Sequence, residues 1–463
     1  MVPAGHRRVR PPRRRRCDLA AVGPVRGALA HAAPRRGTHH LGREGRRMTM
    51  TMEPTTSGGT TRAVDAGRLF SAGHRATLDA HLRAYGDLPT RNPDAMLAEL
   101  EASGLTGRGG AAFPVWRKLS AALDAGGRRR GRAPILIANG TEGEPLSSKD
   151  AVLLRNAPHL VIDGMIAAAK TIGARNVLIV AEGDALRAIE RAVDERPDAR
   201  GIEVVEGAGG FVSGEASALV NLIENDDPRP VDRTKRLTTS GLRGRPTVVQ
   251  NVETLAHLAL IARHGARWFR SVGDPVDPGT RLVTVTGDVP RQGVYEIRTD
   301  ATVRETLAAL DLDFGTVAAA LIGGYHGAWV PAHAFDLPLT ALDLAPFDAS
   351  PGAGIIHVLG DHRCGLEATA GIVTYLAGQS ARQCGPCMFG LPTMVDRFAA
   401  VASGQAVEEN AADLARLAGL VVGRGSCHHP DGTARLVRSA LTVFDHDVRS
   451  HARSRCVRRA AAR

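Results

Sequence analysis

The sequence predicts an α/β fold built on a parallel sheet, followed by a small α+β domain and a helical C-terminal region. Three short apolar runs, at 133–139, 176–183 and 201–207, are separated by segments with helical periodicity. Strands that alternate with helices at this spacing are typical of a parallel sheet. The hydrophobic content of 43% is that of a globular protein, and 463 residues provide for about three domains.

The basic charge of the chain lies at its two ends. Residues 1–47 carry 13 Arg against Asp18 and Glu44, and residues 449–463 carry six Arg and no acid. The net charge of +11 therefore leaves the body, 48–448, at −6. A mildly acidic body does not favour nucleic-acid binding, and both ends have the composition of disordered segments.

Residues 1–52 contain no apolar stretch long enough for a secretory signal. We expect this part to be a disordered basic segment, or a mis-called start with translation beginning at Met48, Met50 or Met52. No run of about 18 apolar residues occurs, so we expect no membrane insertion except through partners. Six cysteines in so long a chain do not form a disulfide scaffold, which fits a cytoplasmic protein.

The first domain is expected at 53–279. The helix at 93–104 should end at Gly104, because glycine readily adopts the left-handed conformation that closes a helix. The helix at 149–174 should break near Pro158. Further helices are expected at 184–195, 214–224 and 251–265.

The pattern changes near residue 280. Strand-like runs at 280–289 and 293–299, a short helix at 302–312 and an apolar run at 318–325 indicate a small α+β domain over 280–355. The chain is then expected to be helical over 356–448, with a basic tail at 449–463.

A glycine-rich loop between Gly104 and Lys118 is the first candidate ligand site. Such a loop can direct several backbone N–H groups at one anion, and basic side chains beside it can add charge. It is neither a Walker A loop nor a dinucleotide fingerprint, since Ala112 stands at the third glycine position. An ordinary turn remains the alternative. The candidate residues are Gly107, Arg108, Gly109, Gly110, Arg117 and Lys118.

Three cysteines near the C-terminus form a second candidate site. Cys384 and Cys387 have two residues between them, so both thiolates can face one metal, and Cys427 follows 40 residues later. Their spacing leaves open a zinc site completed by a histidine, an iron–sulfur cluster, and inert thiols. A dithiol redox pair would need a thioredoxin-like βαβ context, which a helical region lacks.

Five motifs occur in one order along the body: GLTGRGGAAFPVWRK, ANGTEGEPLSSKD, GEASALVNLIE, SGLRGRPTVVQNVETL and QCGPCMFGLP…GSCHHPDG. Over about 90–445 the chain resembles the flavin- and NADH-binding subunit of respiratory complex I, and equally the diaphorase subunits of NAD-linked hydrogenases and formate dehydrogenases. The resemblance implies a Rossmann-like FMN domain, a β-grasp domain and a helical bundle holding a [4Fe-4S] cluster.

In this family NADH gives a hydride to FMN, and single electrons then leave through the cluster. The resemblance thus implies an oxidoreductase that passes electrons from NAD(P)H, or another donor, to a ferredoxin-like or complex I-like partner. It places NADH at Phe113 and Glu144. It places FMN at Gly107, Arg108, Gly109, Gly110, Lys118, Asn139, Glu142, Gly214, Glu215, Gln250 and Asn251, and the cluster at Cys384, Cys387 and Cys427.

The chain departs from the family pattern at the cluster. Ala381 replaces the first cysteine ligand, so three thiolates remain for a [3Fe-4S] cluster or for a [4Fe-4S] cluster with another fourth ligand. Candidates for that ligand are Cys364, His428 and His429. The alternative is a non-catalytic descendant, a structural or assembly subunit whose cysteines bind zinc or nothing.

The chain also departs from the pattern where NADH would bind. Ala216 replaces a carboxylate and Ser120 replaces a stacking aromatic, while 234–241 lacks the family's Pro-Pro-Phe-Pro. At the flavin, Thr141 replaces an aspartate that contacts it in the family. Base stacking contributes about 1–3 kcal/mol per base, so we expect NADH binding weakened by several powers of ten.

Overall fold

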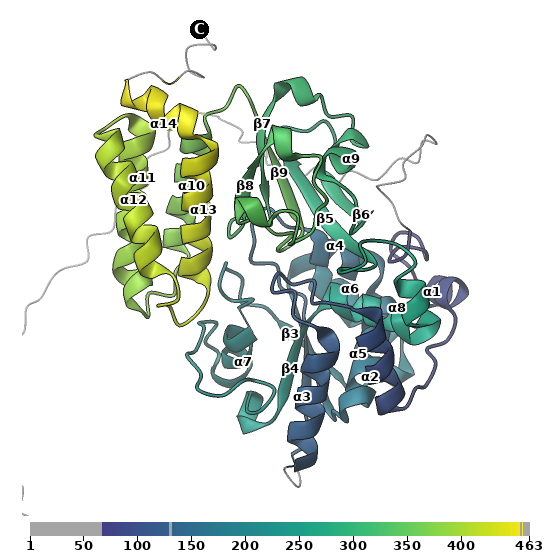
Figure 1. Ribbon diagram of the computed structural model, residues 1–463. Coiled ribbons are helices and arrows are strands. Elements are labelled where there is room, and N and C mark those ends of the chain that lie inside the picture. Colours follow the sequence, from purple (N-terminus) through teal and green to yellow (C-terminus); the bar gives the residue numbers. More distant parts are fainter. Residues whose placement is uncertain (1–66, 129–131, 454–455, 457–463) are drawn as a thin grey trace, which may run out of the picture. The chain divides into compact units, whose positions relative to one another are not determined.

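The computed structural model describes residues 67–128, 132–453 and 456 (Figure 1). The expectations for 1–52 and for most of the basic tail concern residues outside this set. Among the described helices, none is both long and apolar enough to cross a membrane.

Two of the first three helices have side-chain caps at their start. Thr77 accepts from the backbone N–H of Ala80, and Asn92 accepts from that of Ala95. Helix α2 ends at Gly104, whose φ of 69° confirms the predicted left-handed end. The elements are α1 (Leu78–Tyr85), α2 (Pro93–Ser103) and α3 (Val115–Arg128).

A parallel four-stranded sheet of order β3-β2-β1-β4 follows. Its elements are β1 (Ile135–Asn139), α4 (Lys149–Asn156), α5 (Pro158–Ile172), β2 (Asn176–Ala181), α6 (Gly183–Asp194), β3 (Ile202–Glu206), α7 (Ala216–Asn225), β4 (Thr247–Asn251) and α8 (Val252–Phe269). The three predicted strands are confirmed, and the predicted break lies between Asn156 and Pro158. Strand β4 was not predicted, because a five-residue strand leading directly into a helix leaves little pattern of its own.

The two faces of this sheet pack against different helices. Leu136 and Ala138 contribute to a core with α2, α3, α5, α6 and α8, while Ile135 and Ile137 pack against α7. This alternation follows from the two-residue period of a strand. The carboxyl ends of β1 and β4 are left side by side at one edge, where Asn139 pairs with Asn251.

A second sheet, of mixed direction, has the order β6-β5-β9-β7-β8. Its elements are β5 (Thr280–Gly287), β6 (Gly293–Arg298), α9 (Val303–Ala308), β7 (Val317–Ile322), β8 (Ala328–Pro331) and β9 (Ile355–Gly360). Helix α9 begins with a capping box formed by Thr302 and Glu305. Strand β9 is parallel to β5, so this sheet extends beyond residue 355, where the sequence pattern placed the end of the domain.

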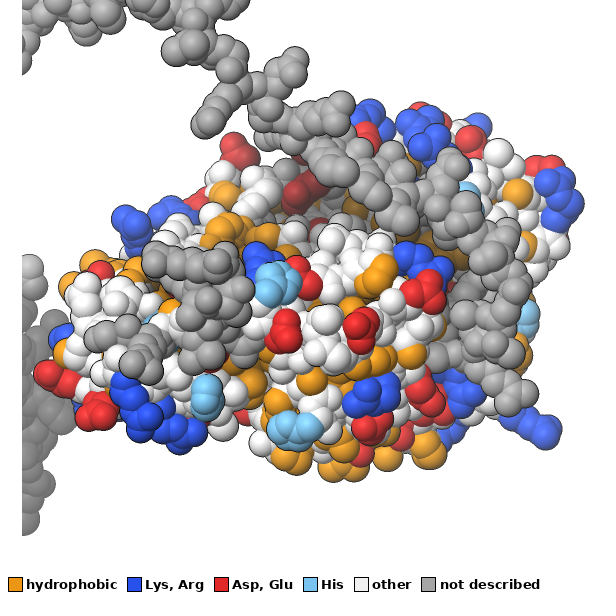
Figure 2. Space-filling model, turned by 90° about the horizontal axis from the view of Figure 1, so that it is seen from above, with side chains coloured by type: hydrophobic (Ala, Val, Ile, Leu, Met, Phe, Trp, Pro, Cys, Tyr) orange, Lys and Arg blue, Asp and Glu red, His pale blue; other side chains and the backbone are white. Residues whose placement is uncertain are grey.

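The C-terminal region is a helical bundle. Figure 1 shows α10 to α13 side by side with α14 across one end. The helices are α10 (Gly365–Gly378), a short π-helical turn (Pro386–Gly390), α11 (Leu391–Ser403), α12 (Val407–Val421), α13 (His429–Val443) and α14 (Asp445–Ala452). Figure 2 shows charged side chains of both signs interspersed on one face of the molecule.

Trp329 of β8 ties the second sheet to the bundle. Its ring is fully buried and meets Phe444 edge-on at 5.2 Å between centroids, and its Nε1 donates to Thr369 Oγ1 at 3.0 Å. We predict that Trp329→Ala lowers the free energy of unfolding by about 3–5 kcal/mol, because it leaves a cavity and removes the hydrogen bond to Thr369 Oγ1. Urea denaturation measures this. The control Leu342→Ala, at a side chain 75% exposed, should change stability by less than about 0.5 kcal/mol.

Candidate functional site

The glycine loop lies at the carboxyl edge of the parallel sheet. A Cβ added to Gly109 would stand 3.2 Å from the Cβ of Asn251, the last residue of β4. The loop is closed by the N–H of Gly107, which donates to Phe113 O at 3.0 Å. Ligands of open α/β sheets bind outside the carboxyl ends of the strands, so this edge is where a ligand is expected.

Glycine is required at Gly110, whose φ is 104°. A Cβ there would stand 3.8 Å from the backbone of Gly352. Gly109 and Gly110 are both exposed. The loop thus presents bare backbone to a ligand, as a phosphate cradle requires.

Arg108, in contrast, directs its charge into the protein. Its guanidinium donates to Asp277 at 2.7 Å and to Pro278 O at 3.1 Å, and only 4% of the residue is exposed. Its N–H donates to Thr254 Oγ1 at 2.8 Å. Arg108 therefore holds the loop in place, and the sequence did not indicate this because Asp277 lies 169 residues away.

Lys118 brings a cation to the same edge. Its Nζ donates to Val249 O at 2.6 Å, and burial lowers its pKa while the nearby Glu215 raises it.

Gln250 is 4% exposed, and within the described residues its Oε1 has no hydrogen-bond partner. An unpaired buried amide oxygen costs about 1–3 kcal/mol, which a polar ligand can recover.

Asn139 joins two loops at this edge. Its Nδ2 donates to Gly214 O at 3.0 Å, and its Oδ1 accepts from Thr141 Oγ1 at 2.8 Å. A Cβ on Gly214 would stand 2.8 Å from Thr141 Oγ1, so only glycine fits there without movement. The hydroxyl of Thr141, at the family's aspartate position, thus has a structural hydrogen bond.

Two predicted flavin contacts are helix caps in this structure. Glu142 accepts from the N–H groups of Asp150 and Ala151, both at 3.2 Å, at the start of α4. Glu215 accepts from Ser217 N at 2.9 Å at the start of α7. Carboxylates at helix N-termini are stabilised by the helix dipole.

A buried charged network lies beneath the edge, and it was not predicted from the sequence. Lys149 Nζ donates to Asp150 at 2.9 Å and to Glu253 at 2.8 Å, and Asp150 accepts from Asn251 Nδ2 at 2.8 Å. Burial lowers the pKa of Lys149, but the two carboxylates raise it further, so it stays charged. The available signal was Glu253, a charged residue among the mostly apolar residues at the start of α8.

Glu144 links the first domain to the turn between β7 and β8. Its Oε2 accepts from Tyr325 N at 2.8 Å, and a Cβ on Gly324 would stand 2.6 Å from that oxygen. Burial raises the pKa of Glu144 to about 7. The carboxyl group therefore changes charge near neutral pH.

We predict that Glu144→Gln makes the protein less sensitive to rising pH. A folded pKa of about 7 against 4.5 unfolded means that the folded state holds the extra proton. The associated stability, up to about 3 kcal/mol, is present below pH 4.5 and is lost as pH rises through 7. Melting temperatures at pH 5 and pH 8 measure this. The exposed Glu409→Gln should melt like the wild type at both.

Cys384, Cys387 and Cys427 are brought together. Burial first, and then the thiols of Cys384 and Cys427, raise the pKa of Cys387 to about 12. Burial and then Glu215 raise the pKa of Cys427. Glu215 therefore lies near enough to act electrostatically on both Lys118 and Cys427.

The three candidates for a fourth ligand lie elsewhere or have other partners. Cys364 precedes α10 and the cysteine pair follows it, and a helix of 14 residues is about 21 Å long. His429 uses both ring nitrogens, on His326 at 3.0 Å and Leu376 O at 2.8 Å. The side chain of His428 is 97% exposed and pairs with Asp431. Three thiols remain, a donor set that fits a cluster with one non-cysteine ligand.

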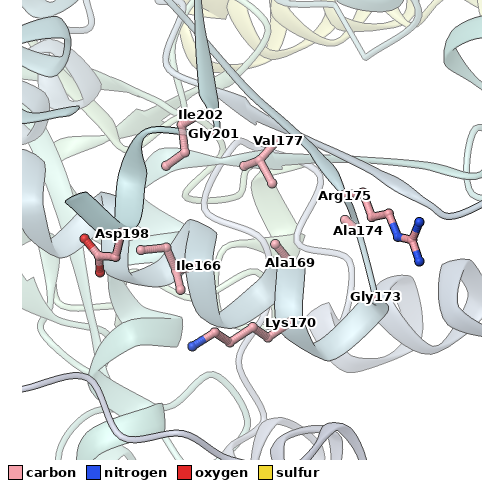
Figure 3. A pocket seen from close by; sticks show the side chains of 10 residues that line it. All are labelled: Ile166, Ala169, Lys170, Gly173, Ala174, Arg175, Val177, Asp198, Gly201 and Ile202. Carbon is pink, nitrogen blue, oxygen red and sulfur yellow. The ribbon is translucent and has the colours of Figure 1, made fainter. Parts of the chain in front are cut away.

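A cavity of about 400 Å³ lies away from this site (Figure 3). It is lined by Val177 and Ile202, near the amino ends of β2 and β3, and by Lys170 and Gly173 at the end of α5. The amino edge of the sheet is opposite the glycine loop. This cavity is therefore separate from the candidate site.

Two regions of the chain match family models. Residues 100–260 match the Nuo51 FMN-binding domain, and residues 367–451 match the NADH-ubiquinone oxidoreductase-F iron-sulfur binding region. The first region contains the glycine loop and the sheet edge, and the second contains the three cysteines.

Several proteins are similar over most of the chain. The NADH-quinone oxidoreductase F subunit numbered 2 of Rhizobium meliloti (strain 1021) is 28% identical, covering 78% of this chain and 90% of the relative. The NADH-quinone oxidoreductase F subunit of Mycobacterium tuberculosis (strain ATCC 25618 / H37Rv) is 29% identical, covering 78% and 85%. An NAD+-reducing [NiFe]-hydrogenase, solved in the air-oxidized state, is 31% identical with a TM-score of 0.71. The match covers 78% of this chain but 63% of the hydrogenase chain.

Proposed function

The chain belongs to the family of NADH-quinone oxidoreductase F subunits, and we propose that it carries electrons from NADH through FMN and an iron–sulfur cluster to a protein partner. It is an NADH dehydrogenase-like oxidoreductase with an FMN-binding domain and an iron–sulfur binding region. The observation that carries the proposal is the carboxyl edge of the parallel sheet, where the exposed backbone of Gly109 and Gly110 meets Lys118 and the unpaired buried oxygen of Gln250.

The carboxyl edge of the parallel sheet would hold FMN. The exposed backbone of Gly109 and Gly110 and the ammonium of Lys118 would bind its phosphate. The unpaired oxygen of Gln250 would accept a hydrogen bond from the flavin's polar groups. When bound, FMN supplies the exchange between a hydride donor and one-electron acceptors.

NADH would stack on Phe113, which stands 48% exposed at the end of the glycine loop. Glu144 would lie beside the nicotinamide nucleotide, held by Tyr325 N. Ala216 offers no carboxylate to a ribose, so nucleotide binding would rest on fewer contacts than in the family pattern.

The three thiols of Cys384, Cys387 and Cys427 would hold the cluster. Because Ala381 supplies no thiol, the fourth ligand of a [4Fe-4S] cluster would be a group other than cysteine. The turn that contains Cys387 also carries exposed apolar side chains, which form part of an apolar surface of the bundle.

The partner would dock on that apolar surface. Its side chains are between 41% and 69% exposed, and they lie on the turn after Cys387 and at the end of α12: Met388, Phe389, Leu420 and Val422. A Cβ on Gly390 would stand 2.6 Å from Val421, which places the turn against α12. Clustered exposed apolar residues mark protein interaction sites. A ferredoxin-like or complex I-like protein would be the acceptor.

In fold terms, we propose that the parallel sheet is the family's Rossmann-like FMN domain and that the second sheet is its β-grasp domain. The competing function is a non-catalytic descendant, favoured by Ala381 and Ala216. The proposed and the competing function differ in whether the protein oxidises NADH.

NADH-dependent reduction of ferricyanide by the purified full chain tests the proposal. We expect protein-bound FMN, identified after release by chromatography, and a rate proportional to the FMN content. Release of no flavin, or a rate that does not follow the flavin content, would support the non-catalytic alternative.

A further inference from the structure

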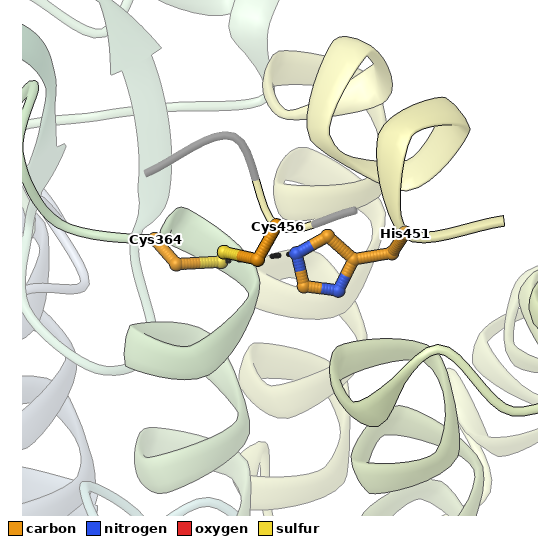
Figure 4. Close-up of side chains that lie close together, drawn as sticks. All are labelled: Cys364, His451 and Cys456. Atoms are coloured by element: carbon orange, nitrogen blue, oxygen red, sulfur yellow. Dashed lines mark hydrogen bonds between the residues drawn. The ribbon is translucent and has the colours of Figure 1, made fainter. Parts of the chain in front are cut away.

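A second group of metal-ligating side chains lies at the far end of α10 from the three cluster cysteines. It consists of Cys364, directly before α10, His451 in the last turn of α14, and Cys456 just beyond it (Figure 4). Their ligand atoms all lie within 4.8 Å of one another. Cys364 and His451 are buried, and Cys456 is half-buried.

The spacing of these atoms fits one metal ion. Cys364 Sγ lies 3.6 Å from His451 Nε2. In a tetrahedral zinc site, with Zn–S of about 2.3 Å and Zn–N of about 2.0–2.1 Å, the sulfur and nitrogen ligands stand about 3.5 Å apart. A [4Fe-4S] cluster would instead need its ligands spread around four irons.

A carboxylate close to the group also favours a cation. Asp447 is four residues before His451 on α14 and acts electrostatically on Cys364. Asp447 is itself only 5% exposed. A divalent cation among these groups would offset the cost of two buried thiolates beside a carboxylate.

We propose that Cys364, His451 and Cys456 bind one Zn²⁺ ion, which fastens the C-terminal segment to the start of α10. Two thiolates and an imidazole form a donor set typical of zinc, and water or a carboxylate can take the fourth position. The site is independent of the proposed electron transfer, since its ligands are separate from Cys384, Cys387 and Cys427. Metal binding would join α10 and α14 at the end of the bundle.

Zinc content tests this in full-length protein carrying Cys384→Ser, Cys387→Ser and Cys427→Ser, which removes the cluster ligands. We expect about one zinc per chain and, after exchange, the thiolate-to-metal absorption of Co²⁺. Adding Cys456→Ser should weaken zinc binding by more than about 100-fold, which exceeds the loss caused by changing a residue that only contacts a ligand. Cys456 is only partly buried against the bundle core, and serine is close to cysteine in size, so we expect this substitution to leave the fold intact.

The matched control is Cys17→Ser in the same background, which should keep its zinc. Loss of all zinc in the cluster-free protein, or equal zinc with and without Cys456, would overturn the proposal. A mass lower by two hydrogens, with no reactive thiols, would show a disulfide between Cys364 and Cys456 instead and would also overturn it.

Discussion

Lys118→Ala is expected to weaken FMN binding about 10- to 100-fold while the protein stays folded. A charge-assisted hydrogen bond contributes about 1.5–3 kcal/mol, and the ammonium of Lys118 lies at the edge where the phosphate would bind. The guanidinium of Arg108 cannot take its place, because Asp277 neutralises it inside the protein. Flavin fluorescence titration of the apoprotein gives both dissociation constants.

Arg117→Ala is the matched control for this prediction. Arg117 is the preceding residue of the same helix, is exposed, and lies over the ring of Trp116 at 5.3 Å. Its removal deletes the same charge without touching the sheet edge, so FMN affinity should stay within about threefold. An equal loss in both variants would mean that only long-range charge matters and that Lys118 does not contact the phosphate.

Cys387→Ser is expected to separate the two halves of the proposed activity. Cys387 is 3% exposed, and serine is close to it in size, so the fold should be kept. The change removes the thiol that interacts with both Cys384 and Cys427, so the cluster should be lost. Reduction of the bound flavin by NADH should continue near the wild-type rate. Electron delivery to a one-electron protein acceptor should fall at least about 100-fold, a loss of about 2.7 kcal/mol or more in transition-state terms.

Cys456→Ser serves as the control here, because it removes a thiol outside the cluster ligands and should keep electron delivery intact. Iron and acid-labile sulfide should be lost from Cys387→Ser and retained in Cys456→Ser. Full electron delivery by Cys387→Ser would contradict the assignment of the three cysteines.

Local features of the fold could be predicted from the sequence. The strands at 133–139, 176–183 and 201–207 are confirmed because each is a compact apolar run between helices. Gly104 ends its helix and the chain breaks before Pro158 because both effects act within one or two residues.

Features that depend on distant partners could not be predicted. The glycines predicted a loop after Gly104, which the structure has between α2 and α3. The direction of the Arg108 side chain, however, depends on Asp277, which is 169 residues away. Cys364 lies next to His451 because α14 packs against α10, a contact between distant parts of the chain. The network of Lys149 and Glu253 joins helices 104 residues apart, a pairing that no local pattern specifies.

The central claim is that this chain binds FMN and reduces it with NADH. The most direct measurement is the visible absorption spectrum of anaerobically purified full-length protein before and after addition of NADH. We expect the flavin bands to bleach when NADH is added. Bleaching should need higher NADH concentrations than in a protein with the complete family pattern of NADH contacts. A spectrum without flavin bands, or flavin bands that NADH leaves unchanged, would contradict the central claim.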